Sequence, residues 1–198
     1  MAAWLQSGPG PRGDQRRPLA AERVDLVALA ADAVESAQAI AADRRPALEV
    51  ATAAPLDVLG DEHRLRQVVA NLVANAITHT PAGADVTVRL SRRPDTAGAA
   101  VLEVTDTAGA LTPQQAQRVF ERFYRADPAR THTGIASGSG SGLGLSIVAA
   151  IVAAHGGAVE LDTVPGRSTT FRVILPAHPD AQPPAAAAAQ DHVAPAPA

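Results

Sequence analysis

Apolar side chains recur at helical spacing in two long segments of the chain. Asp25 is a residue type that caps helices, and the pattern after it predicts a helix running to about Asp43. A second, stronger pattern predicts a helix from Asp61 through Ile77. Each segment gathers its apolar residues on one face, which predicts packing against a core. These positions are Leu26, Leu29, Ala30, Val34 and Ala37 in the first helix and Leu65, Val68, Val69, Leu72, Val73 and Ala76 in the second.

Short apolar runs between turn signals predict strands elsewhere in the chain. They lie at 47–52, 56–59, 86–90, 101–104, 158–163 and 169–175. Thr112-Pro113 starts a predicted helix that carries Ala116, Val119 and Phe120, and residues 143–154 are apolar enough for a buried helix. Helices on one face of a mixed, mostly antiparallel sheet form a two-layer α/β sandwich. We therefore predict an α+β fold of this type.

The two ends of the chain lack such patterns. Residues 1–20 include a Gly-Pro-Gly-Pro run and indicate a linker. Residues 178–198 are rich in Ala and Pro, a composition typical of disorder. The sequence therefore predicts one folded domain at 21–177.

Composition narrows the classes of function. The chain has no cysteine, which excludes a disulfide framework and a thiolate metal site. Its net charge of −3 is unsuited to nucleic acid, so we expect no nucleic-acid partner. The longest apolar run, 143–154, is shorter than the roughly 20 residues of a membrane-spanning helix. No apolar segment typical of a signal peptide follows the N-terminus. We expect a cytoplasmic protein without a membrane segment.

Asn71 and Asn75 are the only asparagines in the chain, and they lie one helical turn apart. Asn is disfavoured inside helices because its side chain competes for backbone hydrogen bonds. Amide oxygens are suited to Mg²⁺, and amide NH₂ groups are suited to phosphate oxygens. The alternative is a pair of buried amides that hydrogen-bond a neighbouring loop.

A glycine-rich turn at 140–145, Gly-Ser-Gly-Leu-Gly-Leu, lies where a loop rich in Gly, Ser and Thr meets the last predicted helix. Glycines let backbone N–H groups approach a phosphate, and a helix N-terminus favours its negative charge. The alternative is that these glycines only shape the loop. A dinucleotide-binding fingerprint is disfavoured because no strand directly precedes the turn. A chain without Lys also lacks the Lys of a Walker-type phosphate loop.

The segment 120–127 holds two of the three Phe residues and the only Tyr. One interpretation is a hydrophobic anchor where a helix meets a loop. The other is a hinge at the base of a nucleotide lid, with Arg125 facing phosphate.

Taken in order, these segments resemble the motifs of sensor histidine kinases. Residues 66–81 resemble the N box, 119–127 the F box, 140–145 the second glycine box, and 165–171 the closing motif. The resemblance spans about Val24 to Pro176. It implies the sandwich fold shared with gyrase, mismatch-repair and heat-shock ATPases, with ATP and Mg²⁺ as cofactors. The implied reaction is phosphoryl transfer from Mg-ATP to a histidine nitrogen, which depends mostly on positioning and charge stabilisation.

The resemblance also implies site residues. Asn75 would coordinate Mg²⁺, while Asn71 and Arg125 would act at the phosphates as catalytic residues. Asp106, which alone would be typical of a turn after a strand, would bind the adenine amino group. Thr170 would help to hold the adenine, with its neighbour Thr169 as the alternative. The other implied nucleotide contacts are His79, Gly109, Gly140, Gly142, Leu143, Gly144 and Leu145.

The chain departs from the family pattern at the first glycine box, which reads Asp-x-Gly-x-Gly in the family. Here Asp106 is followed by Thr-Ala-Gly-Ala, so Ala108 and Ala110 stand at the glycine positions. If both positions need positive φ or close nucleotide contact, each Ala would cost about 1–2 kcal/mol. A total of about 3 kcal/mol would weaken binding roughly a hundredfold. Ser168 also replaces a usual Gly, and Thr78 a frequent Lys.

None of the six histidines lies in the family's phosphoacceptor setting, which is His-Glu or His-Asp followed by Leu-Arg-Thr-Pro-like residues. The resemblance therefore implies a histidine-bearing dimerisation and phosphotransfer domain as a partner in trans, and indirectly a response regulator. A truncated kinase, half of a split kinase or a fragment of a longer reading frame would each have this organisation.

Two other functions compete with the histidine kinase. An anti-sigma-factor serine kinase has the same fold, but the sequence of residues 120–127 resembles histidine kinases specifically. A pseudokinase that docks without turning over ATP is favoured by Ala108 and Ala110. It is opposed by Asn71, Asn75 and the intact glycine-rich turn at 140–145.

Overall fold

The computed structural model describes residues 22–178, except 42, 44–45, 53–54, 94–97, 109–110 and 125–141. The predicted linker, the predicted tail beyond His178 and most of the loop before the last helix lie outside the described residues. The described elements, in chain order, are β1 (Glu22–Asp25), α1 (Leu26–Ile40), β2 (Pro46–Val50), β3 (Asp57–Gly60), α2 (Glu62–His79), β4 (Val86–Arg92), β5 (Ala100–Asp106), α3 (Pro113–Arg118), α4 (Gly144–Ala154), β6 (Ala158–Val164) and β7 (Ser168–Leu175).

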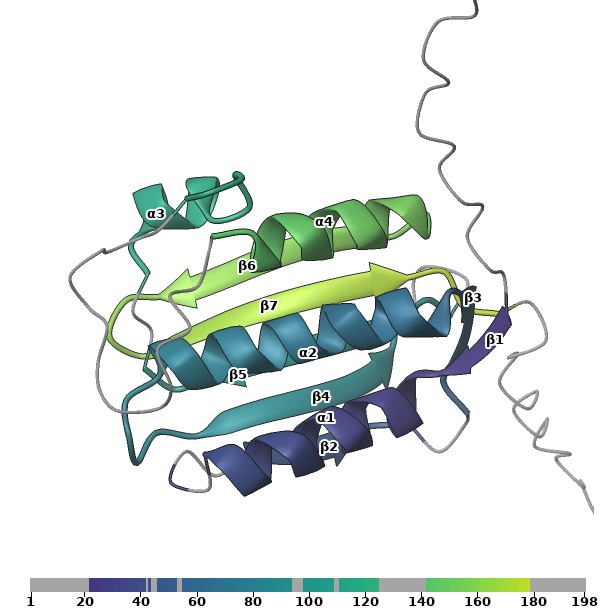
Figure 1. Cartoon of the computed structure of the whole chain (residues 1–198), viewed down its shortest axis with the longest axis horizontal. Helices are drawn as coiled ribbons and strands as arrows, with labels where there is room; N and C mark the ends of the chain where they lie inside the picture. The colour runs from purple at the N-terminus through teal and green to yellow at the C-terminus, as the bar shows by residue number, and fades with distance from the viewer. Residues whose placement is uncertain are drawn as a thin grey trace, which may run out of the picture.

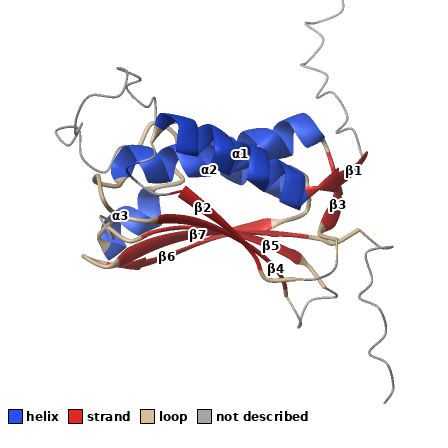
Figure 2. Ribbon diagram, turned by 90° about the horizontal axis from the view of Figure 1, so that it is seen from below, coloured by secondary structure: helices blue, strands red, loops and turns tan. Residues whose placement is uncertain are grey.

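Five of the described strands form the main sheet, in the order β2-β4-β5-β7-β6. Strand β2 pairs with β4 in parallel, and the other three pairings are antiparallel. Helices α1, α2 and α4 lie across one face of this sheet (Figure 1), and the opposite face carries no described helix (Figure 2). The predicted two-layer α+β sandwich is confirmed.

The core lies between these helices and the sheet. Every core position predicted for the first two helices is buried. Both helices begin as expected, because the Asp25 carboxylate accepts hydrogen bonds from the N–H groups of Val27 and Ala28, and Asp61 accepts one from Arg64. Among the residues that the structure describes, none of the helices combines the length and the apolar character needed to cross a membrane.

Several predicted element ends differ from the structure. The first helix, expected to reach about Asp43, ends at Ile40. Helix α3 ends at Arg118, so Val119 and Phe120 lie in the turn beyond it rather than within it. The ring of Phe120 packs edge-on against Phe171 with 6.2 Å between centroids, a tertiary contact that the helical spacing did not reveal. Leu143 is the N-cap of α4 rather than its first helical residue. Asp106 is the last residue of β5 rather than a residue beyond the strand.

A small second sheet was not predicted. Strand β1 pairs antiparallel with β3, and Ala177 forms a bridge to Val58 on β3. The Arg23 guanidinium donates to the buried carboxylate of Asp57, with Nε 2.9 Å from Oδ2. This sheet brings both ends of the described chain together beside the start of α1, as Figure 1 shows.

Gly157 provides a direct test of the packing between α4 and β7. An added Cβ would lie 2.4 Å from the carbonyl oxygen of Ile174 and 2.9 Å from Cγ1 of Val152. Because both neighbours belong to packed elements, we expect Gly157→Ala to lower the free energy of unfolding by about 2–3 kcal/mol. In the control Gly144→Ala, the nearest described atom would be Asn71 Cγ at 4.0 Å. That change should cost less than about 1 kcal/mol. Urea denaturation measures both, and equal stabilities of the two variants would contradict this packing.

Candidate functional site

Asn71 and Asn75 lie on the flank of α2, at the edge of its buried face. Both side chains are half-buried, between core residues and the surface. The Asn71 amide Nδ2 donates a long hydrogen bond, 3.4 Å, to the carbonyl oxygen of Gly144 in the first turn of α4. Among the described residues, none forms a hydrogen bond with the Asn75 amide. The two asparagines therefore face the side of α2 on which α4 begins.

The N-terminus of α4 lacks a side-chain cap among the described residues. Leu143 occupies the N-cap and offers no side-chain oxygen, so no described side chain caps the first N–H groups. The Ser146 hydroxyl donates to the Leu143 carbonyl oxygen at 2.9 Å. The space that a Cβ on Gly144 would fill has no described atom closer than 4.0 Å. A group carrying negative charge fits these features of the helix end.

A tight backbone contact joins Phe123 to Gly142. The Phe123 N–H donates to the Gly142 carbonyl oxygen at 3.0 Å, and both residues have positive φ, 64° and 67°. A Cβ on Gly142 would lie 2.8 Å from the carbonyl carbon of Phe123, so this approach requires glycine. The backbone on the two sides of residues 125–141 therefore meets at one point.

The aromatic segment divides into two parts. Phe120 packs on the core through Phe171, whereas the Phe123 side chain is 70% exposed. The Arg118 guanidinium lies over the Tyr124 ring, 4.7 Å from its centroid. The same guanidinium pairs with Glu121 at 3.2 Å, and this hydrogen bond raises the pKa of Arg118 above its usual value. Phe120 thus anchors the segment, as one of the two interpretations of its sequence expected.

Asp106 ends β5 on the helix-covered side of the sheet, where it is buried. Its Oδ1 accepts a hydrogen bond from the Ala108 N–H at 3.0 Å. Among the described residues, Phe123 is the only non-glycine residue with positive φ, so Ala108 has an ordinary backbone. The strain considered for an alanine at position 108 is therefore not present there. Gly109 and Ala110 lie outside the described residues.

The two candidate threonines of β7 lie on opposite faces of the sheet. Thr170 is half-buried on the open face, and its hydroxyl lies 2.9 Å from that of Thr105. Thr169 is directly opposite Asp106 in the pairing of β5 with β7 and is 3% exposed. None of the described residues forms a hydrogen bond with the Thr169 hydroxyl. The structure thus brings Thr169, and not Thr170, to the face of Asp106.

The signal for this assignment is present in the sequence. The charged Arg172 separates Phe171 from Val173, so these two apolar residues share one face of the strand, and the period of two places Thr169 on that same buried face. That alternation distinguishes Thr169 from its neighbour, and the motif resemblance alone does not.

The other predicted contacts have different positions. His79 is exposed in the last turn of α2, and Leu143 is half-buried before α4. Leu145 lies on the buried face of α4, within the core. Arg125, Gly109 and Gly140 lie outside the described residues.

A row of alternating charges crosses the open face of the sheet, away from these residues. Strand pairing sets Glu49 opposite Arg89, Arg89 opposite Glu103, Glu103 opposite Arg172, and Arg172 opposite Glu160. Arg172 donates to Glu103 at 2.8 Å and to Glu160 at 3.0 Å. Hydrogen bonds to Glu160 and Glu103 raise the pKa of Arg172 above its usual value.

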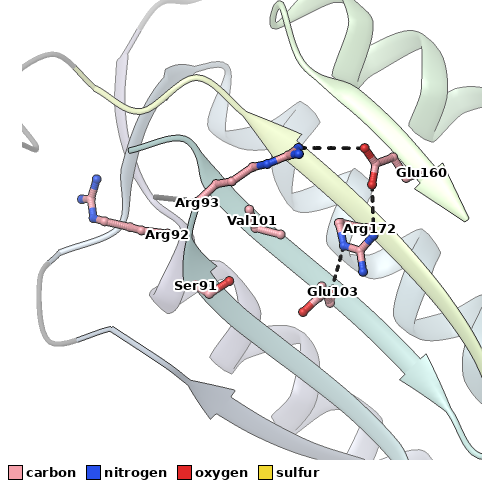
Figure 3. Close-up of a pocket in the computed structure, with 7 residues that line it drawn as sticks. All are labelled: Ser91, Arg92, Arg93, Val101, Glu103, Glu160 and Arg172. Atoms are coloured by element: carbon pink, nitrogen blue, oxygen red, sulfur yellow. Dashed lines mark hydrogen bonds and ion pairs between the residues drawn. The ribbon is translucent and has the colours of Figure 1, made fainter. Parts of the chain in front are cut away.

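Part of this row lines a pocket of about 300 Å³, shown in Figure 3. The carboxylates of Glu103 and Glu160 neutralise Arg172, and Glu160 also lies 4.0 Å from Arg93. Arg172 is therefore not an uncompensated anion-binding group. The remaining lining residues are Ser91, Arg92 and Val101.

The chain is similar in sequence to a family of ATPases and to named sensor histidine kinases. The family described as histidine kinase-, DNA gyrase B-, and HSP90-like ATPase matches residues 60–179. The chain is 41% identical over 165 residues to the probable sensor histidine kinase TcrY of Mycobacterium tuberculosis, covering 83% of this chain and 33% of TcrY. It is 38% identical over 161 residues to the sensor-like histidine kinase SenX3 of Mycolicibacterium smegmatis, covering 80% of this chain and 40% of SenX3. The chain thus spans well under half the length of these curated relatives.

Solved structures share the fold. The mycobacterial sensor histidine kinase MprB has a TM-score of 0.66 and 34% identity, with 80% of this chain and 99% of that chain covered. Full-length ShkA in complex with AMPPNP has a TM-score of 0.67 and 30% identity, with 83% of this chain and 33% of ShkA covered. MprB is named as a sensor histidine kinase, and ShkA was solved with AMPPNP. Each covers at least 80% of this chain.

Proposed function

The chain belongs to the family of histidine kinase-, DNA gyrase B-, and HSP90-like ATPases, and we propose that it is the ATP-binding catalytic domain of a sensor histidine kinase. One observation carries this proposal. The face of α2 that bears Asn71 and Asn75 meets the N-terminus of α4, which no described side chain caps. This arrangement combines amide groups with backbone N–H groups that no described side chain caps, and together these suit a magnesium-bound polyphosphate.

The adenine end of the nucleotide is assigned to the margin where β5 ends and β7 begins. Asp106 supplies a buried carboxylate for the adenine amino group, and Thr169 supplies a buried hydroxyl beside it. We infer that Thr169 takes the role that the motif alone left open between two threonines. Figure 1 supports a single site, because the start of β7, the start of α4 and the end of α2 lie at the same end of the sandwich.

The phosphates are assigned to the place where the asparagine-bearing flank of α2 meets the start of α4. Asn71 and the first N–H groups of α4 would hold phosphate oxygens, and Asn75 would contribute its amide oxygen to Mg²⁺. No described cluster of three or more His, Asp or Glu side chains is suited to a metal ion. An ion held mainly by phosphate oxygens, with one amide ligand, agrees with this donor set. Mg²⁺, when bound, supplies positive charge to the phosphate oxygens. Arg125 and Gly140 remain proposed contacts.

The proposed reaction moves the γ-phosphoryl group of ATP to a histidine nitrogen. The bond between the γ-phosphorus and the β,γ-bridging oxygen breaks, a phosphorus–nitrogen bond forms, and ADP leaves. The contribution of this chain is to bind ATP, hold it in place and offset its charge. The acceptor histidine belongs to a partner domain, and a response regulator receives the phosphoryl group from it. Because ATP is the substrate, we place this activity in the cytoplasm.

A docking module without catalysis remains the second candidate, since Ala110 replaces a family glycine. The ordinary backbone at Ala108 weakens that alternative, because half of the substitution carries no conformational cost. Measuring the binding of Mg-ATP distinguishes the catalytic domain from the docking module.

Mg-ATP binding by isothermal titration calorimetry tests the proposed function. We expect micromolar to sub-millimolar affinity, and we expect Asn75→Ala to weaken it at least about tenfold because a metal ligand is lost. Arg172→Gln is the control, since Arg172 lies on the opposite face of the sheet and should leave the affinity unchanged. A folded protein that releases no heat at millimolar Mg-ATP would refute the kinase assignment and favour the docking module.

The two threonines give a second test of where the adenine lies. Replacing Thr169 by Val removes the buried hydroxyl beside Asp106, so we expect Thr169→Val to weaken ATP binding about three- to tenfold. Thr170→Val removes only the contact with Thr105 on the open face. It should lower stability by about 1 kcal/mol or less and leave ATP affinity unchanged. Calorimetric titration of both variants with Mg-ATP measures these affinities. A larger loss of affinity in Thr170→Val than in Thr169→Val would assign the adenine contact to Thr170 instead.

A further inference from the structure

His155 follows the last residue of α4 and is half-buried against the start of α2. Its ring makes two hydrogen bonds to different elements. Nδ1 lies 2.8 Å from the carbonyl oxygen of Ile151, in the last turn of the helix that His155 follows. Nε2 lies 3.1 Å from the backbone nitrogen of Asp61, the N-cap of α2. The ring therefore bridges the end of one helix and the beginning of another.

The two bonds fix the protonation of the ring. The backbone N–H of Asp61 is a donor only, so Nε2 must be the acceptor and carry no proton. A carbonyl oxygen is an acceptor only, so Nδ1 carries the proton and donates to Ile151. The bridge thus requires one tautomer of the neutral ring, and a protonated ring could not accept from Asp61.

Gly60 makes room for this bridge. A Cβ at position 60 would lie 2.6 Å from Cδ2 of His155 and 2.8 Å from Nε2. Gly60 does not have positive φ, so the close approach of the ring and of Leu65, whose Cδ1 would lie 2.8 Å from that Cβ, and not backbone conformation, is what demands glycine here. The bend between β3 and α2 is therefore shaped around the His155 ring.

A second bond joins the same two helices at the opposite end. Helices α2 and α4 run antiparallel, as Figure 1 shows, and Asn71 of α2 donates to Gly144 at the start of α4. Ten residues separate Asp61 from Asn71, which corresponds to about 15 Å along α2. The separation between Gly144 and His155 along α4 is similar. The helices are thus tied at two points about three turns apart.

Two such ties determine how far one helix can slide along the other. Between these two hydrogen bonds, α2 and α4 pack through apolar side chains of the core. Hydrophobic burial is not directional, so it specifies the axial position less sharply than a hydrogen bond does. The hydrogen bond from Asp61 to His155 is directional and lies far from the asparagines, so it restricts sliding at the end away from the site.

We propose that His155 is a positioning residue that sets the register of α2 against α4, and thereby the position of Asn71 and Asn75 relative to the first turn of α4. This inference rests on the proposed function, in which those groups share one magnesium-bound nucleotide. His155 touches neither the nucleotide nor the metal ion. Its effect on binding passes through the axial position of α2.

Two conservative variants separate the bridge from a merely local role. A Gln side chain at position 155 places its amide oxygen near the original Nε2, where it can accept from Asp61. An Asn side chain at the same position reaches only the location of Nδ1 and can bond only to Ile151. His155→Gln therefore keeps the connection to α2, whereas His155→Asn keeps only the bond within α4.

The first readout needs no nucleotide. Selective ¹⁵N-asparagine labelling reports only Asn71 and Asn75, because the chain has no other asparagine. Asn75→Ala assigns the two sets of signals. We expect His155→Asn to shift the side-chain NH₂ signals of Asn71, about 15 Å from the mutated contact. His155→Gln should leave them close to their wild-type positions.

The second readout is Mg-ATP affinity by calorimetry, on samples whose folding is verified by circular dichroism. We expect His155→Asn to bind about five- to tenfold more weakly than the wild type, and His155→Gln to retain most of the affinity. If His155→Asn does not fold, Gly60→Ala replaces it, because its Cβ meets the same ring, together with Cδ1 of Leu65.

The outcomes are distinct. Wild-type Asn71 signals and affinity in His155→Asn would overturn the proposal, and so would equal losses in both His155 variants, which would indicate local packing of the ring. A wild-type protein that does not bind Mg-ATP would refute the proposed function instead. In that case the Asn71 signals still decide whether His155 sets the register of the helices.

Discussion

The burial of one face of α2 on the sheet is the constraint on which the rest of the structure depends. Its six core positions, Leu65 through Ala76, are all buried, which fixes the rotation of this helix about its axis. Asn71 and Asn75 lie to one side of that face, so the same rotation holds both amides at the edge of the core beside α4. Their placement is thus a consequence of hydrophobic packing.

Much of this arrangement could be predicted from the sequence, because a helix of 18 residues repeats its pattern over five turns. The buried faces of α1 and α2 follow from spacing alone. Strand β1 could not be predicted in this way, since its four residues alternate too briefly and it is stabilised by pairing with β3. The Phe120 turn likewise depends on Phe171, about 50 residues later in the chain.

For the candidate site too, features that depend on local sequence could be predicted, and features that depend on long-range contacts could not. Local motifs proposed the asparagines, Asp106 and the glycines, because their residue types suit the chemistry of a nucleotide. The choice between Thr169 and Thr170 depends on strand parity, which the motif does not encode. His155 was missed because its role depends on a contact with Asp61, far away in sequence. Position 108 shows the reverse case, in which the motif suggested a conformational cost that the backbone does not impose.

The central claim is that a magnesium-bound nucleotide lies on the helix-covered face of the sheet, against α2 and α4. Titration of ¹⁵N-asparagine-labelled protein with Mg-ATP, followed by NMR, tests this claim most directly. The account predicts that the side-chain signals of Asn71 and Asn75 shift together and saturate with the dissociation constant found by calorimetry. Saturable binding that leaves both asparagine side chains unmoved would contradict it, because the nucleotide would then lie elsewhere on the protein.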